Sequence, residues 1–147
     1  MGKKNKEEQF FLRMKAMLGE TEARDLIEAL KPLAAKSVRH NRTTQPNLTG
    51  TDGKPVPWCS SGRYWENETQ PSRTIDYVAG NYYIQESSAM LPVSIAERVM
   101  DFKGKIVLDM TGAPGGKTTQ AAEIIGDGYL VSNEVVRKRC DALIWNV

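Results

Sequence analysis

Residues 105–119, with the sequence KIVLDMTGAPGGKTT, constrain the fold of this chain more than any other stretch. The three apolar residues at 106–108 are typical of a parallel strand that is covered by helices on both faces. Asp109 follows them at the carboxyl end of the strand. A glycine-rich turn comes next, and residues 116–125 have the apolar spacing of a helix. Because ligands of open α/β sheets bind beyond the carboxyl ends of the strands, this stretch predicts a cofactor loop.

The spacing of the glycines separates three classes of nucleotide-binding loop. A phosphate-cradling P-loop needs four residues between its first glycine and the Gly-Lys pair, and only three separate Gly112 from Gly116. The dinucleotide pattern fails because Pro114 stands where that pattern has its second glycine. A nucleoside cofactor without a pyrophosphate remains, and S-adenosylmethionine fits best. A second predicted strand, residues 129–132, leads to Glu134, about 20 residues past the turn, where ribose-binding acids sit.

Motifs from about residue 31 onward carry a further signal. They are Asp109 with Ala113-Pro114-Gly115-Gly116-Lys117-Thr118, Asn133-Glu134 with Arg139, Leu143 and Asn146, the segment 80–88 followed by Met90-Leu91-Pro92, Pro32-Leu33 with Ser37-Val38-Arg39, and Pro57-Trp58-Cys59. Together they resemble the Nop/Sun-type RNA cytosine-5 methyltransferases, and within them the group of the bacterial 16S ribosomal-RNA small-subunit methyltransferase F. The sequence departs from that pattern at Thr111-Gly112, where small residues such as alanine are usual, and at residues 40–43, where a more apolar strand is usual.

The resemblance implies methyl transfer from S-adenosylmethionine to C5 of a cytosine, with ribosomal RNA as the substrate and partner. The cofactor site that it implies consists of Thr111, Gly112, Ala113, Pro114, Gly115, Gly116, Lys117 and Glu134. Asp109 would hold the loop or face the methionine part, and Arg139 would support Glu134 by a charge pair. No catalytic residue is expected, because the two cysteines of the family's chemistry lie in later Pro-Cys and Thr-Cys motifs that this sequence lacks.

The resemblance and the pattern of elements together predict an α/β fold. A small, mainly helical α+β domain would precede the start of a doubly wound, Rossmann-like S-adenosylmethionine-binding domain. We expect an RNA-recognition-type domain at residues 1–79 and the first, truncated part of the methyltransferase domain at residues 80–147. The chain thus looks like an amino-terminal fragment. Because such a fragment has an open sheet edge and an uncovered apolar face, we expect it to be poorly stable and inactive alone.

Helical spacing predicts two helices in the first domain, at residues 7–18 and 21–30, the second closed by Pro32. The first helix carries a stripe that we interpret as core packing: Phe10, Phe11, Met14, Met17 and Leu18. Residues 41–72 are rich in turn-forming residues and predict loops with short strands. A later helix would run through Met90, Val93, Ala96, Val99 and Met100, with Pro92 starting or kinking it.

The two cysteines favour packing over chemistry. Cys140 shares a helical stripe with Val136, Leu143 and Val147 and is predicted to be buried. Cys59 follows Trp58 in a short apolar stretch and is also interpreted as structural. Two cysteines without a signal-peptide pattern or a long apolar run predict a cytoplasmic location and no membrane contact. With one histidine in the chain, no metal site is expected.

The distribution of charge along the chain is more suggestive of RNA binding than the net charge of +2. Residues 1–42 hold ten Lys or Arg against six Asp or Glu, whereas residues 43–147 hold ten against twelve. The basic residues that could meet phosphates are Lys3, Lys4, Lys6, Lys36, Arg39 and Arg42. A solvated charge run is the plainer explanation. Two other functions stay open: a methyltransferase of the same fold with another substrate, and a non-catalytic RNA-binding or assembly protein that retains the methyltransferase fold.

Overall fold

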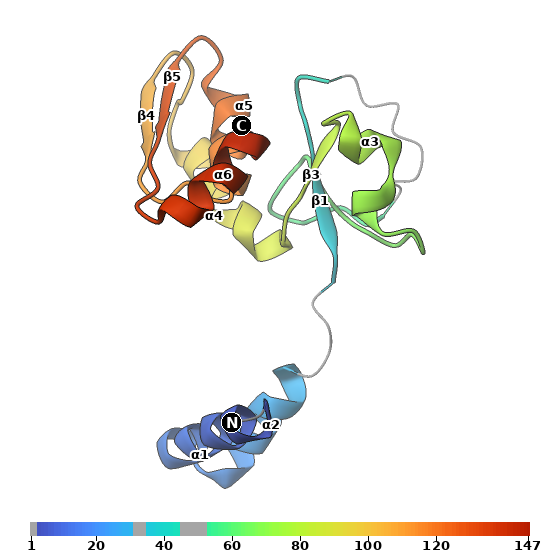
Figure 1. Cartoon of the computed structure of the whole chain (residues 1–147), viewed down its shortest axis with the longest axis vertical. Helices are drawn as coiled ribbons and strands as arrows, with labels where there is room; N and C mark the ends of the chain where they lie inside the picture. Colours follow the sequence, from blue (N-terminus) through green and yellow to red (C-terminus); the bar gives the residue numbers. More distant parts are fainter. Residues whose placement is uncertain (1–2, 31–34, 45–52) are drawn as a thin grey trace. The chain divides into compact units, whose positions relative to one another are not determined.

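A computed structural model describes residues 3–30, 35–44 and 53–147, with side chains from Lys6 onward (Figure 1). The chain divides into two compact units, Met1–Ala34 and Ala35–Val147. Helices and strands are mixed in it, so the expected α/β class is confirmed at that level. The expected boundary between residues 79 and 80 stays a prediction.

The first unit is a pair of helices, α1 (Lys3–Leu18) and α2 (Glu20–Leu30). Gly19 joins them with a φ of +88°, a conformation that suits glycine. Both predicted helices are confirmed, and each begins earlier than expected. The predicted core stripe is largely wrong, because Phe10, Met17 and Leu18 are exposed and only Phe11 and Met14 are half-buried. Two short helices offer too little facing surface to cover five large side chains. Pro32 and Leu33 lie outside the described residues.

The second unit begins with a three-stranded antiparallel sheet in the order β2-β1-β3. Its strands are β1 (Ser37–His40), β2 (Gly62–Tyr64) and β3 (Tyr82–Ile84). Val38 at the centre pairs with Arg63 on one side and with Ile84 on the other. The short helices η1 (Pro71–Arg73) and α3 (Ile75–Val78) lie between β2 and β3 in the chain. This small sheet therefore contains strands from both sides of the predicted 79/80 boundary.

A cluster of buried residues joins this sheet to the next helix, α4 (Ser87–Val99). Val56, Cys59 and Met90 form it, and the half-buried Trp58 packs against it. The indole of Trp58 also donates a 2.7 Å hydrogen bond to the carbonyl of Ser87, at the start of α4. Cys59 is thus a packing residue, as expected. Pro92 lies inside α4, so the helix begins before it.

A parallel β-α-β unit follows, made of β4 (Ile106–Asp109), α5 (Gly116–Ile125) and β5 (Tyr129–Ser132). The two strands pair in register from Ile106 with Tyr129 to Asp109 with Ser132. These three elements have the bounds that the sequence predicts. Helix α5 packs against both strands and against α4, and α6 (Arg137–Asn146) ends the chain.

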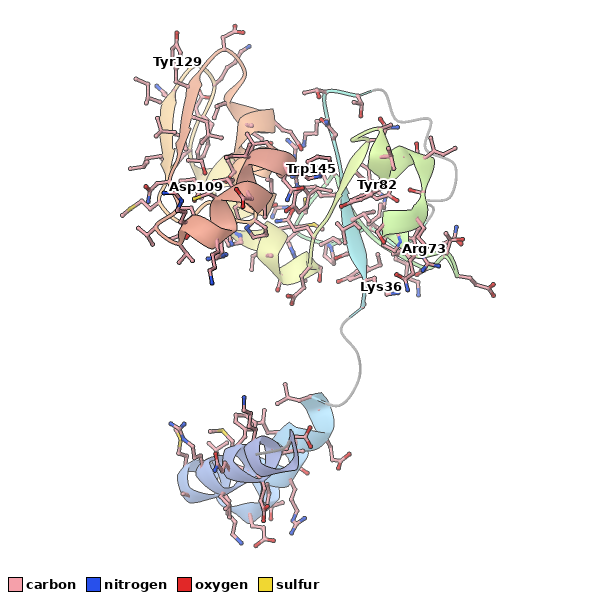
Figure 2. The ribbon with its side chains drawn as sticks, viewed as in Figure 1. Lys36, Arg73, Tyr82, Asp109, Tyr129 and Trp145 are labelled. Carbon is pink, nitrogen blue, oxygen red and sulfur yellow. The ribbon has the colours of Figure 1, made fainter. Side chains whose placement is uncertain are left out.

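One face of the β4-β5 sheet is open, as Figure 1 shows, with helices on the other side only. Ile106 and Leu108 are 79% and 60% exposed, and their neighbours Tyr129 and Val131 are 74% and 54% exposed. Figure 2 shows the ring of Tyr129 projecting away from the helices. The predicted cover on both faces of residues 106–108 is therefore wrong, because no described element lies on this side. The expectation of an uncovered apolar face is confirmed.

None of the helices in the described ranges is long and apolar enough to cross a membrane. Both cysteines are free thiols, and Cys59 is the buried one. The prediction for Cys140 is only partly right, because its side chain is half-buried. On the same stripe Leu143 is buried, whereas Val136 and Val147 are exposed. Helix α6 meets the loop before α5 through Leu143 and Asn146, whereas Val136 on the same stripe faces solvent.

Candidate functional site

The loop between β4 and α5 is held by Asp109, the last residue of β4. One carboxylate oxygen of Asp109 accepts a 3.1 Å hydrogen bond from the backbone N–H of Thr111. The other accepts a 2.6 Å hydrogen bond from the hydroxyl of Thr118, a fully buried residue in the first turn of α5. Both ends of the loop are therefore tied to one side chain. Of the two roles expected for Asp109, these contacts favour holding the loop.

Gly112 is a glycine because β5 comes close to it. A Cβ atom at this position would lie 2.0 Å from Oγ of Ser132 and 3.1 Å from Oγ1 of Thr118. The N–H of Gly112 donates a 2.8 Å hydrogen bond to the carbonyl of Asn133, just after β5. The loop is thus fastened to the ends of both parallel strands.

Gly115 has a φ of +117°, which favours glycine, and precedes the first residue of α5. A Cβ atom on it would lie 3.1 Å from Cβ of Asn146, near the end of α6. The side chain of Asn146 also donates a 2.8 Å hydrogen bond to the carbonyl of Pro114. Helix α6 therefore packs directly on this side of the loop.

Glu134, just beyond β5, has a side chain that is only 2% exposed. Its Oε1 atom accepts a 2.8 Å hydrogen bond from the N–H of Val136, at the start of α6. Its Oε2 atom forms an ion pair with Nη1 of Arg139 at 3.3 Å but has no hydrogen-bond partner among the residues that the structure describes. Arg139 also donates to the carbonyl of Ala113 in the loop. Glu134 thus keeps one unsatisfied acceptor, and Arg139 connects it to the loop.

The eight predicted site residues occupy three neighbouring places in the second unit. They are the loop after β4, the first turn of α5 and the position just beyond β5. In the loop Thr111, Pro114 and Lys117 are exposed, whereas Gly112, Ala113 and Gly115 are buried. A ligand can therefore meet this loop at its exposed residues and at the half-buried Gly116.

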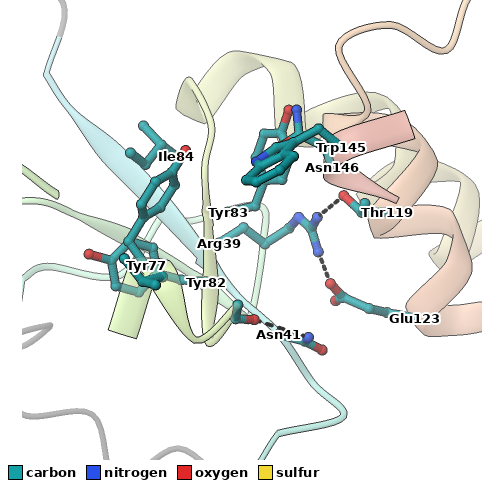
Figure 3. Close-up of a pocket in the computed structure, with 12 residues that line it drawn as sticks. Arg39, Asn41, Tyr77, Tyr82, Tyr83, Ile84, Thr119, Glu123, Trp145 and Asn146 are labelled. Atoms are coloured by element: carbon teal, nitrogen blue, oxygen red, sulfur yellow. Dashed lines mark hydrogen bonds and ion pairs between the residues drawn. The ribbon is translucent and has the colours of Figure 1, made fainter. Parts of the chain in front are cut away.

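Sequence reasoning missed the role of Arg39 in this region. Its side chain is fully buried and pairs with Glu123 of α5, so Arg39 is neither accessible to RNA phosphates nor part of a solvated charge run, the two possibilities that the sequence left open (Figure 3). Its partners come from distant parts of the sequence, which no local pattern could have revealed. Arg39 also lines a pocket of about 420 Å³ with Tyr83 of β3 and Trp145 of α6.

The other basic residues that could meet phosphates differ in their surroundings. Arg42 donates two hydrogen bonds to Glu97 of α4, in a pair whose side chains are 30% and 37% exposed. Lys6 and Lys36 are exposed, which suits both a phosphate contact and a solvated charge run. The side chains of Lys3 and Lys4 lie outside the described residues. In the described ranges no group of three His, Cys, Asp or Glu residues is arranged to hold a metal ion.

Comparison with known proteins gives consistent matches. A family model described as the N-terminal domain of 16S rRNA methyltransferase RsmF matches residues 7–87. The ribosomal RNA small subunit methyltransferase F of Shewanella woodyi is 43% identical over 98 residues, which cover 63% of this chain and 20% of that protein. Its counterpart in Pectobacterium carotovorum subsp. carotovorum is 35% identical over 139 residues, 84% of this chain and 28% of that protein.

A solved structure is also similar, that of a methyltransferase homolog protein from Pyrococcus horikoshii. It is 30% identical, with a TM-score of 0.73, and the match covers 88% of this chain and 44% of that one. The present chain spans between a fifth and three tenths of the length of the two curated relatives.

Proposed function

Because this chain belongs to the family of the 16S rRNA methyltransferase RsmF, we propose that it contributes to methyl transfer from S-adenosylmethionine to C5 of a cytosine in ribosomal RNA. The chain would supply the RNA-recognition-type domain, at residues 1–79, and the first part of the cofactor domain, at residues 80–147. The names of its curated relatives support ribosomal RNA methylation. The cofactor and the target atom are our inference from the loop and from the motifs of the sequence.

The cofactor domain of this proposal is the start of a Rossmann-like, doubly wound sheet. Its first β-α-β segment would be β4, α5 and β5, whose parallel strands and intervening helix are what that fold requires. The proposed ligand crevice lies at the carboxyl ends of these strands, where Asp109 and Glu134 stand. Strands β1 and β2, with the helices before them, would belong to the preceding α+β domain, whereas β3 of the same sheet lies within residues 80–147.

The residues present fit an adenosine-containing cofactor without a pyrophosphate. Glu134 offers Oε2, a buried oxygen that is paired with Arg139 at 3.3 Å but receives no hydrogen bond from the described residues, and a carboxylate at this place can accept hydrogen bonds from ribose hydroxyls. This unsatisfied oxygen is the observation that carries the proposal. When bound, S-adenosylmethionine supplies a methyl group on a positively charged sulfur.

The chain's own residues would bind and orient this cofactor. Asp109 holds both ends of the loop, so that residues 111–117 keep one conformation. Arg139 bridges Glu134 and the carbonyl of Ala113, which sets the distance between the ribose acceptor and the loop. We propose no catalytic residue here. Cys59 is buried in the core, and Cys140 points its sulfur at backbone carbonyls of residues 134 and 136.

Replacing the charge of Glu134 tests the cofactor half of the proposal. In Glu134→Gln the amide oxygen can still accept the hydrogen bond from Val136, so α6 keeps its start. We expect the dissociation constant of S-adenosylmethionine, measured by calorimetry, to rise about tenfold or more, because hydrogen bonds to a charged group contribute about 1.5–3 kcal/mol. Asp141→Asn, an exposed acid on α6, is the matched control.

Two results would count against this proposal. Equal affinity in Glu134→Gln and the unchanged chain would remove Glu134 from the site. A chain that binds a 16S rRNA fragment but not S-adenosylmethionine would favour the non-catalytic RNA-binding function.

A further inference from the structure

The guanidinium of Arg39, on β1, reaches across to the first turns of α5. Its Nη2 atom donates to Oγ1 of Thr119 at 2.7 Å and, more weakly, to the carbonyl of Gly116 at 3.4 Å. Its Nη1 atom pairs with Glu123, one turn further along α5. Figure 3 shows this side chain extended between the two elements. A single buried cation therefore contacts α5 at three points, two of them in its first turn.

Thr119 passes this contact on to the cofactor loop. Its hydroxyl accepts from Arg39 and donates a 2.9 Å hydrogen bond to the carbonyl of Gly115. The same carbonyl accepts a 2.8 Å hydrogen bond from the N–H of Thr119. Gly115 is the residue whose positive φ turns the loop into α5. The orientation of its peptide group thus depends on the threonine that Arg39 holds.

A second route joins the same two places. The Nε atom of Arg39 donates a 3.0 Å hydrogen bond to the buried side chain of Gln85, which follows β3. Ser37 of β1 holds the backbone of Gln85 by two further hydrogen bonds. A Cβ atom on Gly116 would lie 3.3 Å from Cδ of Gln85. Gln85, held by Arg39 and Ser37, therefore packs directly against Gly116, the first residue of α5.

From this geometry we propose that Arg39 is a positioning residue for the cofactor loop. It fixes the peptide groups of Gly115 and Gly116 from the side of the antiparallel sheet, and it acts through Thr119 and Gln85. The inference rests on the proposed function, in which these two glycines belong to the cofactor site. A buried ion pair is weak evidence for stability, because the cost of removing two charges from water offsets their attraction. The planar guanidinium of Arg39 instead fixes the relative positions of the groups that it contacts, because its N–H donors form a rigid fork that lysine cannot reproduce.

Two conservative variants and a control test the proposal. Arg39→Lys keeps a positive charge for Glu123 but cannot serve Thr119 and Gln85 at once. Thr119→Val keeps the shape and removes the hydroxyl that connects Arg39 to Gly115. Arg42→Lys alters an Arg–Glu pair that joins the segment after β1 to α4 rather than to the loop. We expect the first two to raise the dissociation constant of S-adenosylmethionine about tenfold, and the control to leave it unchanged.

A readout without cofactor separates this inference from the proposed function. Amide hydrogen exchange of the unliganded chain should quicken in a peptide covering residues 112–120 in Arg39→Lys and Thr119→Val, and not in Arg42→Lys. A merely structural role would quicken exchange throughout the second unit. If Arg39→Lys fails to fold, the cofactor affinity and the amide hydrogen exchange of Thr119→Val decide whether Arg39 positions the loop.

The outcomes are distinct. If the unchanged chain does not bind S-adenosylmethionine, the proposed function fails for it, and local quickening of exchange would still show that Arg39 positions the loop. If exchange in residues 112–120 is the same in all variants, the positioning role is overturned. It is also overturned if the unchanged chain binds the cofactor and both variants bind it equally well.

Discussion

Replacing Gly112 with alanine tests whether the loop glycine is required by β5. The added Cβ atom would lie 2.0 Å from Oγ of Ser132, whereas ordinary contact begins at 3.4 Å, so the atoms must separate by about 1.4 Å. Such overpacking costs about 1–3 kcal/mol. Moving Ser132 also breaks its hydrogen bond to Thr118, which contributes about 1 kcal/mol. We therefore expect Gly112→Ala to lower the free energy of unfolding by about 2–4 kcal/mol.

Urea denaturation followed by circular dichroism measures this change in a double-mutant cycle with Ser132→Ala. Removal of the serine hydroxyl should cost about 1 kcal/mol alone, because the hydrogen bond to Thr118 is lost, and should restore about 1 kcal/mol or more in the double variant relative to Gly112→Ala, because the shortest contact is then gone. Gly80→Ala provides a comparison, since Gly80 has a φ of +71° but open space where the Cβ would go. If Gly112→Ala unfolds like the unchanged chain, or if Ser132→Ala restores nothing, the glycine is required for another reason, such as close approach of a ligand.

Three further predictions concern the rest of the second unit. Met90→Ala should lower the free energy of unfolding by about 2–5 kcal/mol, because Met90 is fully buried, whereas Met100→Ala, 61% exposed, should change it little; urea titrations compare them. Burial lowers the pKa of His40, so the folded chain favours the neutral ring, and thermal stability should fall as the pH drops below about 6.5. The variant His40→Gln should show a smaller fall, and an equal fall in both chains would contradict this prediction. Ile106→Thr combined with Tyr129→Thr should reduce self-association in sedimentation velocity, since both residues lie on the open face of β4-β5, and unchanged association would place the contact elsewhere.

The elements around the loop between β4 and α5 could be predicted from the sequence because their signals are local. An apolar run that ends on Asp109, a cluster of glycines and a helical spacing after Gly116 lie within one short stretch. The structure has β4, α5 and β5 with the expected bounds. The helix pair of the first unit was also predictable, since Gly19 lies between two stretches with helical spacing. In each case the residues that decide the structure are neighbours in the chain.

What could not be predicted depends on residues that are far apart in the sequence. Arg39 reads as an ordinary basic residue until Glu123, 84 positions away, is placed beside it. The exposure of Ile106 was missed for a related reason: an apolar run shows that a strand can be covered, and only the tertiary structure shows whether it is. The burial of Cys140 was overestimated for the same reason, because an apolar stripe at helical spacing does not show how much of the stripe packs against other elements.

The burial of the Arg39–Glu123 pair has a consequence for work at different ionic strengths. Dissolved ions screen exposed charges strongly and buried pairs much less, so added salt should weaken the Arg42–Glu97 pair and leave Arg39 in place. Binding to RNA phosphates, by contrast, falls steeply as salt displaces the protein from them. A wash with concentrated salt should therefore remove any nucleic acid bound to this chain without disturbing the geometry of Gly115 and Gly116. Ionic strength thus offers a way to measure cofactor binding separately from RNA binding.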